Sequence, residues 1–166
     1  MTGGAIFSPC QRYRPMLWRS WGCDNDMAPS WLWIGMNPSV ADVDVDAPTC
    51  RREVGFTRRA GMTLNVKCNV ADWRATDPKV FRHHDIEPRS AENLQAIMQA
   101  AHTASRVIAA WGDVPKPLRP YATDTAAMLL GHGIKLWCLG MPRSGAPRHP
   151  LYVRSDTPLV AWKCVT

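Results

Sequence analysis

The sequence lacks any apolar run near the length of about 20 residues that a transmembrane helix needs, so we expect no membrane-spanning segment. Its first residues, MTGGAIFSPCQRYRP, lack the basic and then apolar pattern of a secretory signal, which predicts a cytoplasmic protein. Internal repeats, low-complexity tracts and a linker are also missing, and the 14 prolines are scattered. The length of 166 residues therefore predicts one domain over residues 1–166.

Closely spaced cysteine pairs are missing too. The six cysteines stand at positions 10, 23, 50, 68, 138 and 164, and the five histidines show no partner spacing. Zinc sites, redox motifs and iron–sulfur clusters need such spacing. We therefore expect reduced thiols, with no metal and no cofactor.

Positive charge exceeds negative charge, with a formal net charge of +6 and a pI of about 9.2. This balance favours a polyanionic partner such as nucleic acid, although a basic surface that only confers solubility explains it equally well. The arginines of the expected basic patch are Arg12, Arg14, Arg19, Arg51, Arg52, Arg58, Arg59, Arg143, Arg148 and Arg154.

Four apolar runs of strand length are predicted to form buried β-strands. Their lack of polar alternation is typical of a parallel sheet that is covered on both faces. The runs lie near residues 31–35, 64–69, 107–111 and 135–139. A further strand is expected in YRPMLWRSW, at the sheet edge, because Pro15 argues against a central position.

Three helical segments separate these strands. We expect Asp46 to cap the first helix, with Pro48 in its opening turn, and Ser90 to cap the second. An apolar stripe that ends at Gly131 and Gly133 marks the third helix. Right-handed crossovers then predict an α/β fold, a three-layer α/β/α sandwich with a central four-stranded, mainly parallel sheet.

Distinctive residues follow each predicted strand. Asn37 follows the first strand, Asn69 closes the second, Trp111-Gly112 ends the third, and His149 lies in the loop after the fourth. Ligands of such sheets bind beyond the carboxyl ends of the strands, so we expect these residues to meet around one rim. Each also has a plain structural explanation: a backbone-bonded turn asparagine, a strand cap, packing, or a surface histidine.

These segments resemble the signatures of the uracil-DNA glycosylase superfamily. GMNPS looks like the first signature, in its asparagine branch, and HPLY resembles the histidine-proline loop. LNVKCNVADWRA is similar to the strand that ends in a base-reading asparagine, and RVIAAWG to the strand that closes in tryptophan-glycine. The blocks NPSVAD, RATDP and PRHPLY also resemble a small bacterial and phage family of unknown function.

The resemblance implies a uracil-DNA glycosylase-like domain and a hydrolase that cleaves the N-glycosidic bond of a flipped pyrimidine, modified or not. His149 would stabilise charge on the departing base. Asn37 would hold the attacking water, and Asp42 is a candidate for helping to activate it. The expected base-binding residues are Asn69, Met36 and Trp73, and the alternative for Trp73 is core packing.

The implied partner is DNA, single-stranded or with a flipped base, bound by a monomer. Ser39, Arg143 and Arg148 are candidates for phosphate contacts. Leu151 or Tyr152 is expected to wedge into the vacated stack, unless it packs under the loop. Ser39 departs from the family pattern, in which many relatives carry glycine, tyrosine or another bulky residue.

Three acids at alternate positions, Asp42, Asp44 and Asp46, are followed by Glu53 at the offsets of a calcium loop. Ala47 stands where that loop needs glycine, and a strand precedes it instead of a helix. A helix cap is therefore the favoured role for Asp46, and a magnesium site for nucleotide phosphates stays open.

Two other functions remain open at this point. One is a nucleic-acid-binding protein without catalysis on the same fold. The other is an enzyme that modifies a nucleotide or base by group transfer. Binding that depends steeply on salt would favour the first, and binding of mononucleotides but not strands would favour the second.

Overall fold

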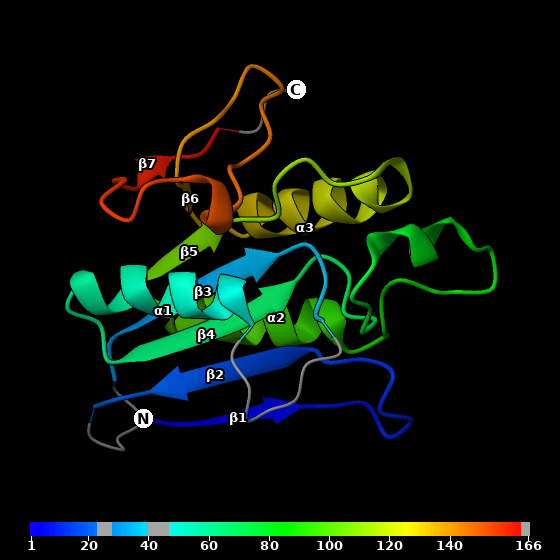
Figure 1. The fold of residues 1–166 in the computed structure, drawn as a ribbon, viewed down its shortest axis with the longest axis horizontal. Coiled ribbons are helices and arrows are strands. Elements are labelled where there is room, and N and C mark those ends of the chain that lie inside the picture. Colours follow the sequence, from blue (N-terminus) through cyan, green and yellow to red (C-terminus); the bar gives the residue numbers. More distant parts are fainter. Residues whose placement is uncertain (23–27, 40–46, 164–166) are drawn as a thin grey trace.

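The computed structural model describes residues 1–22, 28–39 and 47–163. These residues form an α/β structure with a seven-stranded mixed sheet of order β1-β2-β4-β3-β5-β6-β7 (Figure 1). None of their helices has the length and apolar character needed to cross a membrane. The strands are β1 (Thr2–Ile6), β2 (Met16–Ser20), β3 (Ser30–Gly35), β4 (Leu64–Asn69), β5 (Arg106–Ala109), β6 (Leu136–Cys138) and β7 (Val160–Ala161).

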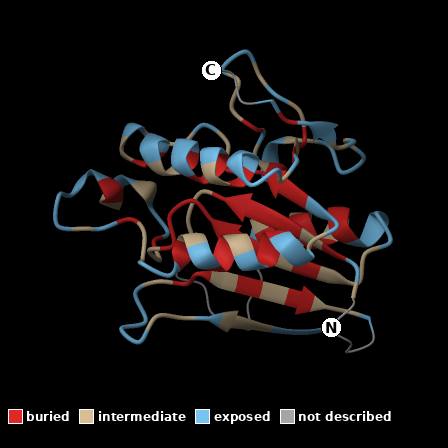
Figure 2. Ribbon diagram, turned by 180° about the vertical axis from the view of Figure 1, so that it is seen from behind, coloured by how far each residue is buried: buried red, intermediate tan, exposed pale blue. Residues whose placement is uncertain are grey.

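Three α-helices lie between the strands, and they pack on both faces of the sheet (Figures 1 and 2). Helix α1 (Pro48–Arg59) covers one face, where Phe56 packs with Trp33. Helices α2 (Asn93–Thr103) and α3 (Arg119–Gly131) cover the other face, where they pack with Leu32 and Ile34. Alternate residues of β3 therefore pack into the apolar cores on opposite faces of the sheet. Because both faces are covered, the strand is apolar throughout, as the sequence predicts.

The prediction of a four-stranded, mainly parallel sheet is wrong. The four predicted strands do form the parallel part, in the order β4-β3-β5-β6. Antiparallel pairing adds β1 and β2 at one side and β7 at the other. Strands β1 and β7 do not show up as apolar runs in the sequence, because β1 is largely exposed and β7 has only two residues.

Strand β2 lies inside the sheet, between β1 and β4, and the prediction of an edge strand is wrong. Pro15 precedes the first residue of β2, Met16, so the missing N–H group costs no ladder hydrogen bond. The polar and small residues of β1 then form the edge beside β2.

The helix ends follow the predictions in part. Pro48 opens α1 and Gly131 closes α3, as expected. Asp46, the expected cap of α1, lies outside the described residues. The prediction that Ser90 caps α2 is wrong: the helix begins three residues later, and Ser90 donates from Oγ to Asp72 Oδ2 over 2.5 Å.

A buried polar network fixes α1 on the sheet. The Thr57 hydroxyl of α1 accepts from Trp33 Nε1 over 2.9 Å and lies 2.8 Å from Asn65 Oδ1. Trp33 and Thr57 are fully buried, and Asn65 is almost so. Buried polar groups are costly without partners, so this network specifies where the helix sits.

We predict that Thr57→Val lowers the free energy of unfolding, because it leaves Trp33 Nε1 and Asn65 Oδ1 unpaired. The expected loss is about 1–3 kcal/mol for each orphaned group. Equilibrium urea denaturation measures it. Thr123→Val, on the exposed face of α3, is the matched control and should change stability by less than about 0.5 kcal/mol. Equal losses in both variants would contradict the role given to the network.

Candidate functional site

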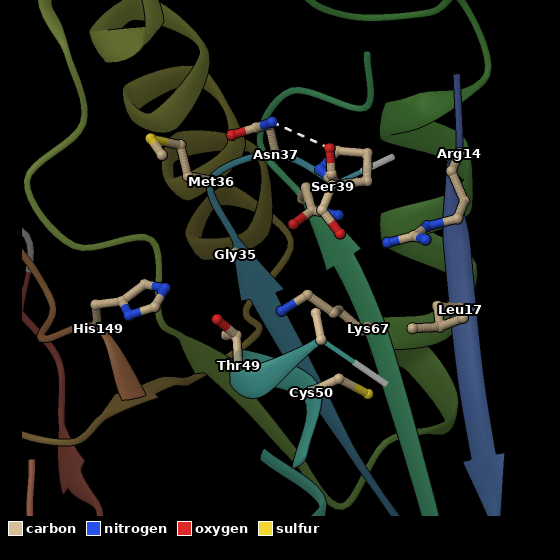
Figure 3. A pocket seen from close by; sticks show the side chains of 13 residues that line it. Arg14, Leu17, Gly35, Met36, Asn37, Ser39, Thr49, Cys50, Lys67 and His149 are labelled. Atoms are coloured by element: carbon tan, nitrogen blue, oxygen red, sulfur yellow. Dashed lines mark hydrogen bonds between the residues drawn. The ribbon is translucent and has the colours of Figure 1, made fainter. Parts of the chain in front are cut away.

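A cavity of about 110 Å³ lies at the carboxyl ends of β3 and β4, beside the first turn of α1 (Figure 3). Its size approaches that of the roughly 150 Å³ cavity that admits a benzene ring in another protein. Five of the predicted site residues line it: Met36, Asn37, Ser39, Asn69 and His149. The lining also includes Arg14, Thr49, Cys50 and Lys67, to which the sequence analysis gave no role in a site.

Asn37 is held in the turn after β3. Its Nδ2 donates to Ala75 O over 2.8 Å and to Pro38 O over 3.1 Å. The bond to Pro38 is the local turn interaction that its structural explanation requires, and the bond to Ala75 ties this turn to the loop after β4. With Nδ2 engaged, Oδ1 is the remaining polar atom of the side chain, and it is an acceptor.

Asn69 stands opposite Gly35 at the last paired position of β3 and β4. The residue is 2% exposed, and its Oδ1 has no hydrogen-bond partner among the described residues. The backbone is secured separately, because Asn93 Nδ2 donates to Asn69 O over 3.0 Å. A buried, unpaired amide oxygen at a cavity wall is a costly feature that a ligand N–H would satisfy.

Lys67 extends from β4 into the cavity, where Figure 3 shows its amine pointing toward the side on which Thr49 and His149 lie. Its Nζ lies 2.5 Å from Oε1 of Glu53, a fully buried residue of α1. Burial raises the pKa of Glu53, and the charges of Lys67 and Arg14 oppose that rise. Glu53, the last acid at the offsets of a calcium loop, is thus engaged in an ion pair.

His149 is positioned by the short helix η3 (Pro150–Tyr152) and by α1. Arg52 of α1 donates to the carbonyl oxygens of Pro150, the first residue of η3, and of Val153, the residue that follows it. On the opposite side, a Cβ added to Gly112 would lie 3.2 Å from His149 Cβ. Because Gly112 also has φ of +69°, glycine suits this position in both space and backbone conformation.

The imidazole of His149 is neutral near pH 7. Burial, and then the nearby charge of Lys67, lower its pKa to about 4. The Leu151 N–H donates to His149 Nδ1 over 3.3 Å, so Nδ1 is the acceptor nitrogen and Nε2 carries the proton. His149 therefore offers one N–H donor without a positive charge.

Several predicted residues do not line the cavity. Trp73 packs against Tyr13, with ring centroids 5.2 Å apart, and the guanidinium of Arg12 lies over its ring. Arg143 is exposed in the loop after β6. Asp42 lies outside the described residues. Arg148 and Tyr152 line another hollow, to which His149 also contributes. Leu151 precedes Tyr152 in sequence and is not among the residues that line either space.

Lys67 is the residue of the cavity that the sequence analysis most clearly missed. A signal for it existed, since a strand buries a lysine in the middle of the apolar run LNVKCN, and a buried lysine needs a partner. Its partner, Glu53, is 14 residues away in sequence, and nothing in the pattern of α1 predicts that pairing.

In the part of the chain that the structure describes, no three histidine, cysteine or acidic side chains gather as a metal site would require. Asp42, Asp44 and Asp46 lie outside that part, so the expected role of these acids is not described. Cys10, Cys50, Cys68 and Cys138 are free thiols, as predicted.

The fold and the cavity define an α/β protein with a polar, ring-sized site at the carboxyl ends of parallel strands. The chain belongs to the family described as "Protein of unknown function (DUF1643)", whose model matches residues 12–151. Comparisons with curated proteins and with solved structures find no match. Membership in a family of unknown function was expected, whereas the resemblance to the uracil-DNA glycosylase superfamily stays a prediction.

We predict that His149 titrates near pH 4 instead of near its ordinary value of 6.5. Because the unfolded chain then takes up this proton first, His149 should lower the stability of the fold as the pH falls from about 6.5 to 4. Nitrogen-detected NMR of the imidazole gives the pKa and the tautomer. Lys67→Met should raise this pKa, and a midpoint between pH 6 and 7 in the unaltered protein would contradict the buried position.

Gly35→Ala is predicted to disturb the cavity, because the added Cβ would lie 2.7 Å from Asn69 Oδ1 and 3.2 Å from Lys67 Nζ. Overpacking of this kind costs about 1–3 kcal/mol. Urea denaturation measures the loss. Gly55→Ala is the control, since its Cβ would meet only Arg59 Nη1, at 3.6 Å, and it should stabilise α1 by roughly 0.5–1 kcal/mol. A stable Gly35→Ala variant would show that Asn69 is free to move.

Proposed function

We propose that the protein is a DNA glycosylase-like hydrolase that cleaves the N-glycosidic bond of a flipped pyrimidine. One observation carries the proposal: Asn37, Asn69 and His149, which follow different strands, line the same cavity. A pyrimidine inside a duplex cannot enter such a cavity, so the base has to be extruded or already unpaired.

The unpaired amide of Asn69 supports recognition of the base. An amide offers an acceptor and a donor side by side, which complements a pyrimidine edge that presents an N–H and a carbonyl. Because Oδ1 is buried and has no partner in the described part of the chain, a base that lacks the matching donor would leave it unsatisfied. That loss is the physical source of selectivity in this proposal.

The neutral His149 supports stabilisation of the departing base. Cleavage of the glycosidic bond sends its electron pair to the base, so that negative charge develops on the ring and its carbonyl oxygens. The Nε2–H of His149 would donate to such an oxygen in a water-poor cavity, where a fixed donor acts most strongly. Its low pKa keeps this donor in one form at neutral pH.

Asn37 supports the placement of water. Its Oδ1 can accept a hydrogen bond from a water molecule, which then attacks the anomeric carbon of the sugar. An amide does not take the proton of that water at neutral pH, so we expect slower turnover than a carboxylate would give. The two bonds of Nδ2 hold the acceptor in position.

The surface beside the cavity suits a nucleic-acid strand. Tyr152 is 82% exposed and Leu151 is 41% exposed, next to His149 in sequence. Apolar residues so exposed near a base-binding cavity are suited to fill the space that a flipped base leaves. Arg148 and Arg143 are both exposed in the segment after β6 and are candidates for phosphate contacts.

We predict that the protein releases a base from oligonucleotides that carry uracil, mismatched thymine or a hypermodified pyrimidine. His149→Ala should lower the rate by about a hundred- to thousandfold, as expected for loss of one charge-stabilising donor. Alkaline cleavage at abasic sites and mass spectrometry of the released base measure the reaction. The second method separates hydrolysis from transfer of a group to the base.

The matched control is His84→Ala, which removes an exposed histidine that does not line the cavity. Its rate should equal that of the unaltered protein. If the folded protein binds the oligonucleotides, loses this binding steeply with salt and releases no base from any of them, the hydrolase proposal is wrong. A binding protein without catalysis would then be the better description.

A further inference from the structure

Lys67 places a positive charge at the wall of the cavity, and the mechanism above does not use it. Its side chain is 8% exposed and its Nζ pairs with Glu53 Oε1. The ammonium also lies close enough to His149 to lower the pKa of the imidazole. Figure 3 shows the amine pointing into the same space that His149 faces.

The pair is poorly explained by stability alone. Buried ion pairs are often no more stabilising than apolar side chains of similar volume, and the neighbours of this pair in the sheet are apolar. An ammonium has three N–H donors, and Glu53 is the one hydrogen-bond partner recorded for Lys67 among the described residues. Donors therefore remain for a ligand in the cavity.

The charge of the lining favours an anion. Among the described residues, Arg14 and Lys67 are the charged side chains that line the cavity, and both are cationic. Glu53 lies behind Lys67 and does not line the cavity. The carboxylate thus holds the lysine in place from behind, while the cavity itself presents the positive charge.

A nucleophilic role for Lys67 does not suit this arrangement. A lysine attacks carbon only as the neutral amine, and enzymes obtain that form by apolar burial or by a neighbouring cation. Here the amine is instead paired with a carboxylate at 2.5 Å. The side chain is arranged to act through its charge.

We propose that Lys67 binds a pyrimidine ring in its anionic form, and that it is thereby a catalytic residue for departure of the base. The second part rests on the proposed function, and the first part does not. In the reaction, the C1′–N bond breaks and its electron pair stays on the ring. Water forms the new C1′–O bond, and the proton that this water loses neutralises the released ring through solvent.

Ring binding tests the first part without catalysis. Uracil is neutral at pH 7, whereas barbiturate is an anion of nearly the same size. Calorimetry should show that the unaltered protein binds barbiturate about ten- to hundredfold more tightly than uracil, the range expected for a charge-assisted hydrogen bond. Lys67→Met should abolish this preference. The exposed Lys79→Met is the control and should keep it.

Lys67→Met leaves the buried Glu53 without its partner and can unfold the protein. The double variant Lys67→Met/Glu53→Leu removes both charges and is expected to fold. It should still lack the preference for barbiturate, and base release should stay at least a hundredfold below that of the unaltered protein. Recovery of either property in the double variant would show that the pair is only structural and would overturn the proposal.

Equal binding of barbiturate and uracil by the unaltered protein would also overturn it. The two proposals fail separately. A protein that prefers barbiturate through Lys67 but releases no base from DNA retains the anion site described here and contradicts only the hydrolase.

Discussion

The site depends on the register of β3 against β4. Gly35 pairs with Asn69 at the last position of the two strands, and Trp33 pairs with Lys67 two residues earlier. Because side chains alternate between faces, a shift of one residue would move Lys67 and Asn69 to the other side of the sheet. The absence of a side chain at Gly35 then leaves the space that Asn69 Oδ1 and Lys67 Nζ occupy.

Electrostatics in this cavity follow from burial. Glu53 would be costly alone, and so would Lys67, but together they form a pair that leaves the positive end at the cavity wall. The same burial keeps His149 neutral. The cavity therefore combines a cation, a neutral donor and an amide oxygen that no described residue pairs, within a space for a single ring.

The sequence was most informative where a chemical requirement is local. The four central strands are continuous apolar runs because both of their faces are buried, and each is found close to its predicted position. Asn37, Asn69 and His149 line one cavity because parallel strands end at a common edge. The glycosidic chemistry itself stays a proposal.

What the sequence did not reveal depends on contacts between distant segments. Strands β1 and β7 are held by pairing with their neighbours and have little apolar pattern of their own. Serine is a common helix cap, yet the Ser90 hydroxyl donates its hydrogen bond to Asp72, 18 residues earlier. The pairing of Lys67 with Glu53 likewise becomes intelligible only when α1 lies on β4: the lysine is unusual within its apolar strand, but nothing within the helix marks Glu53 as its partner.

Helix α1 contacts two walls of the cavity, strand β4 and the segment around η3. Its first turn lines the cavity, and its Glu53 pairs with Lys67 of the sheet. Its Arg52 donates hydrogen bonds to the carbonyl oxygens of Pro150 and Val153, at the two ends of the η3 segment. The spacing between this helix and the sheet therefore helps to set the width available to a ligand. A relative that accommodates a larger ring would have to change the side chains packed beneath α1, among them Phe56.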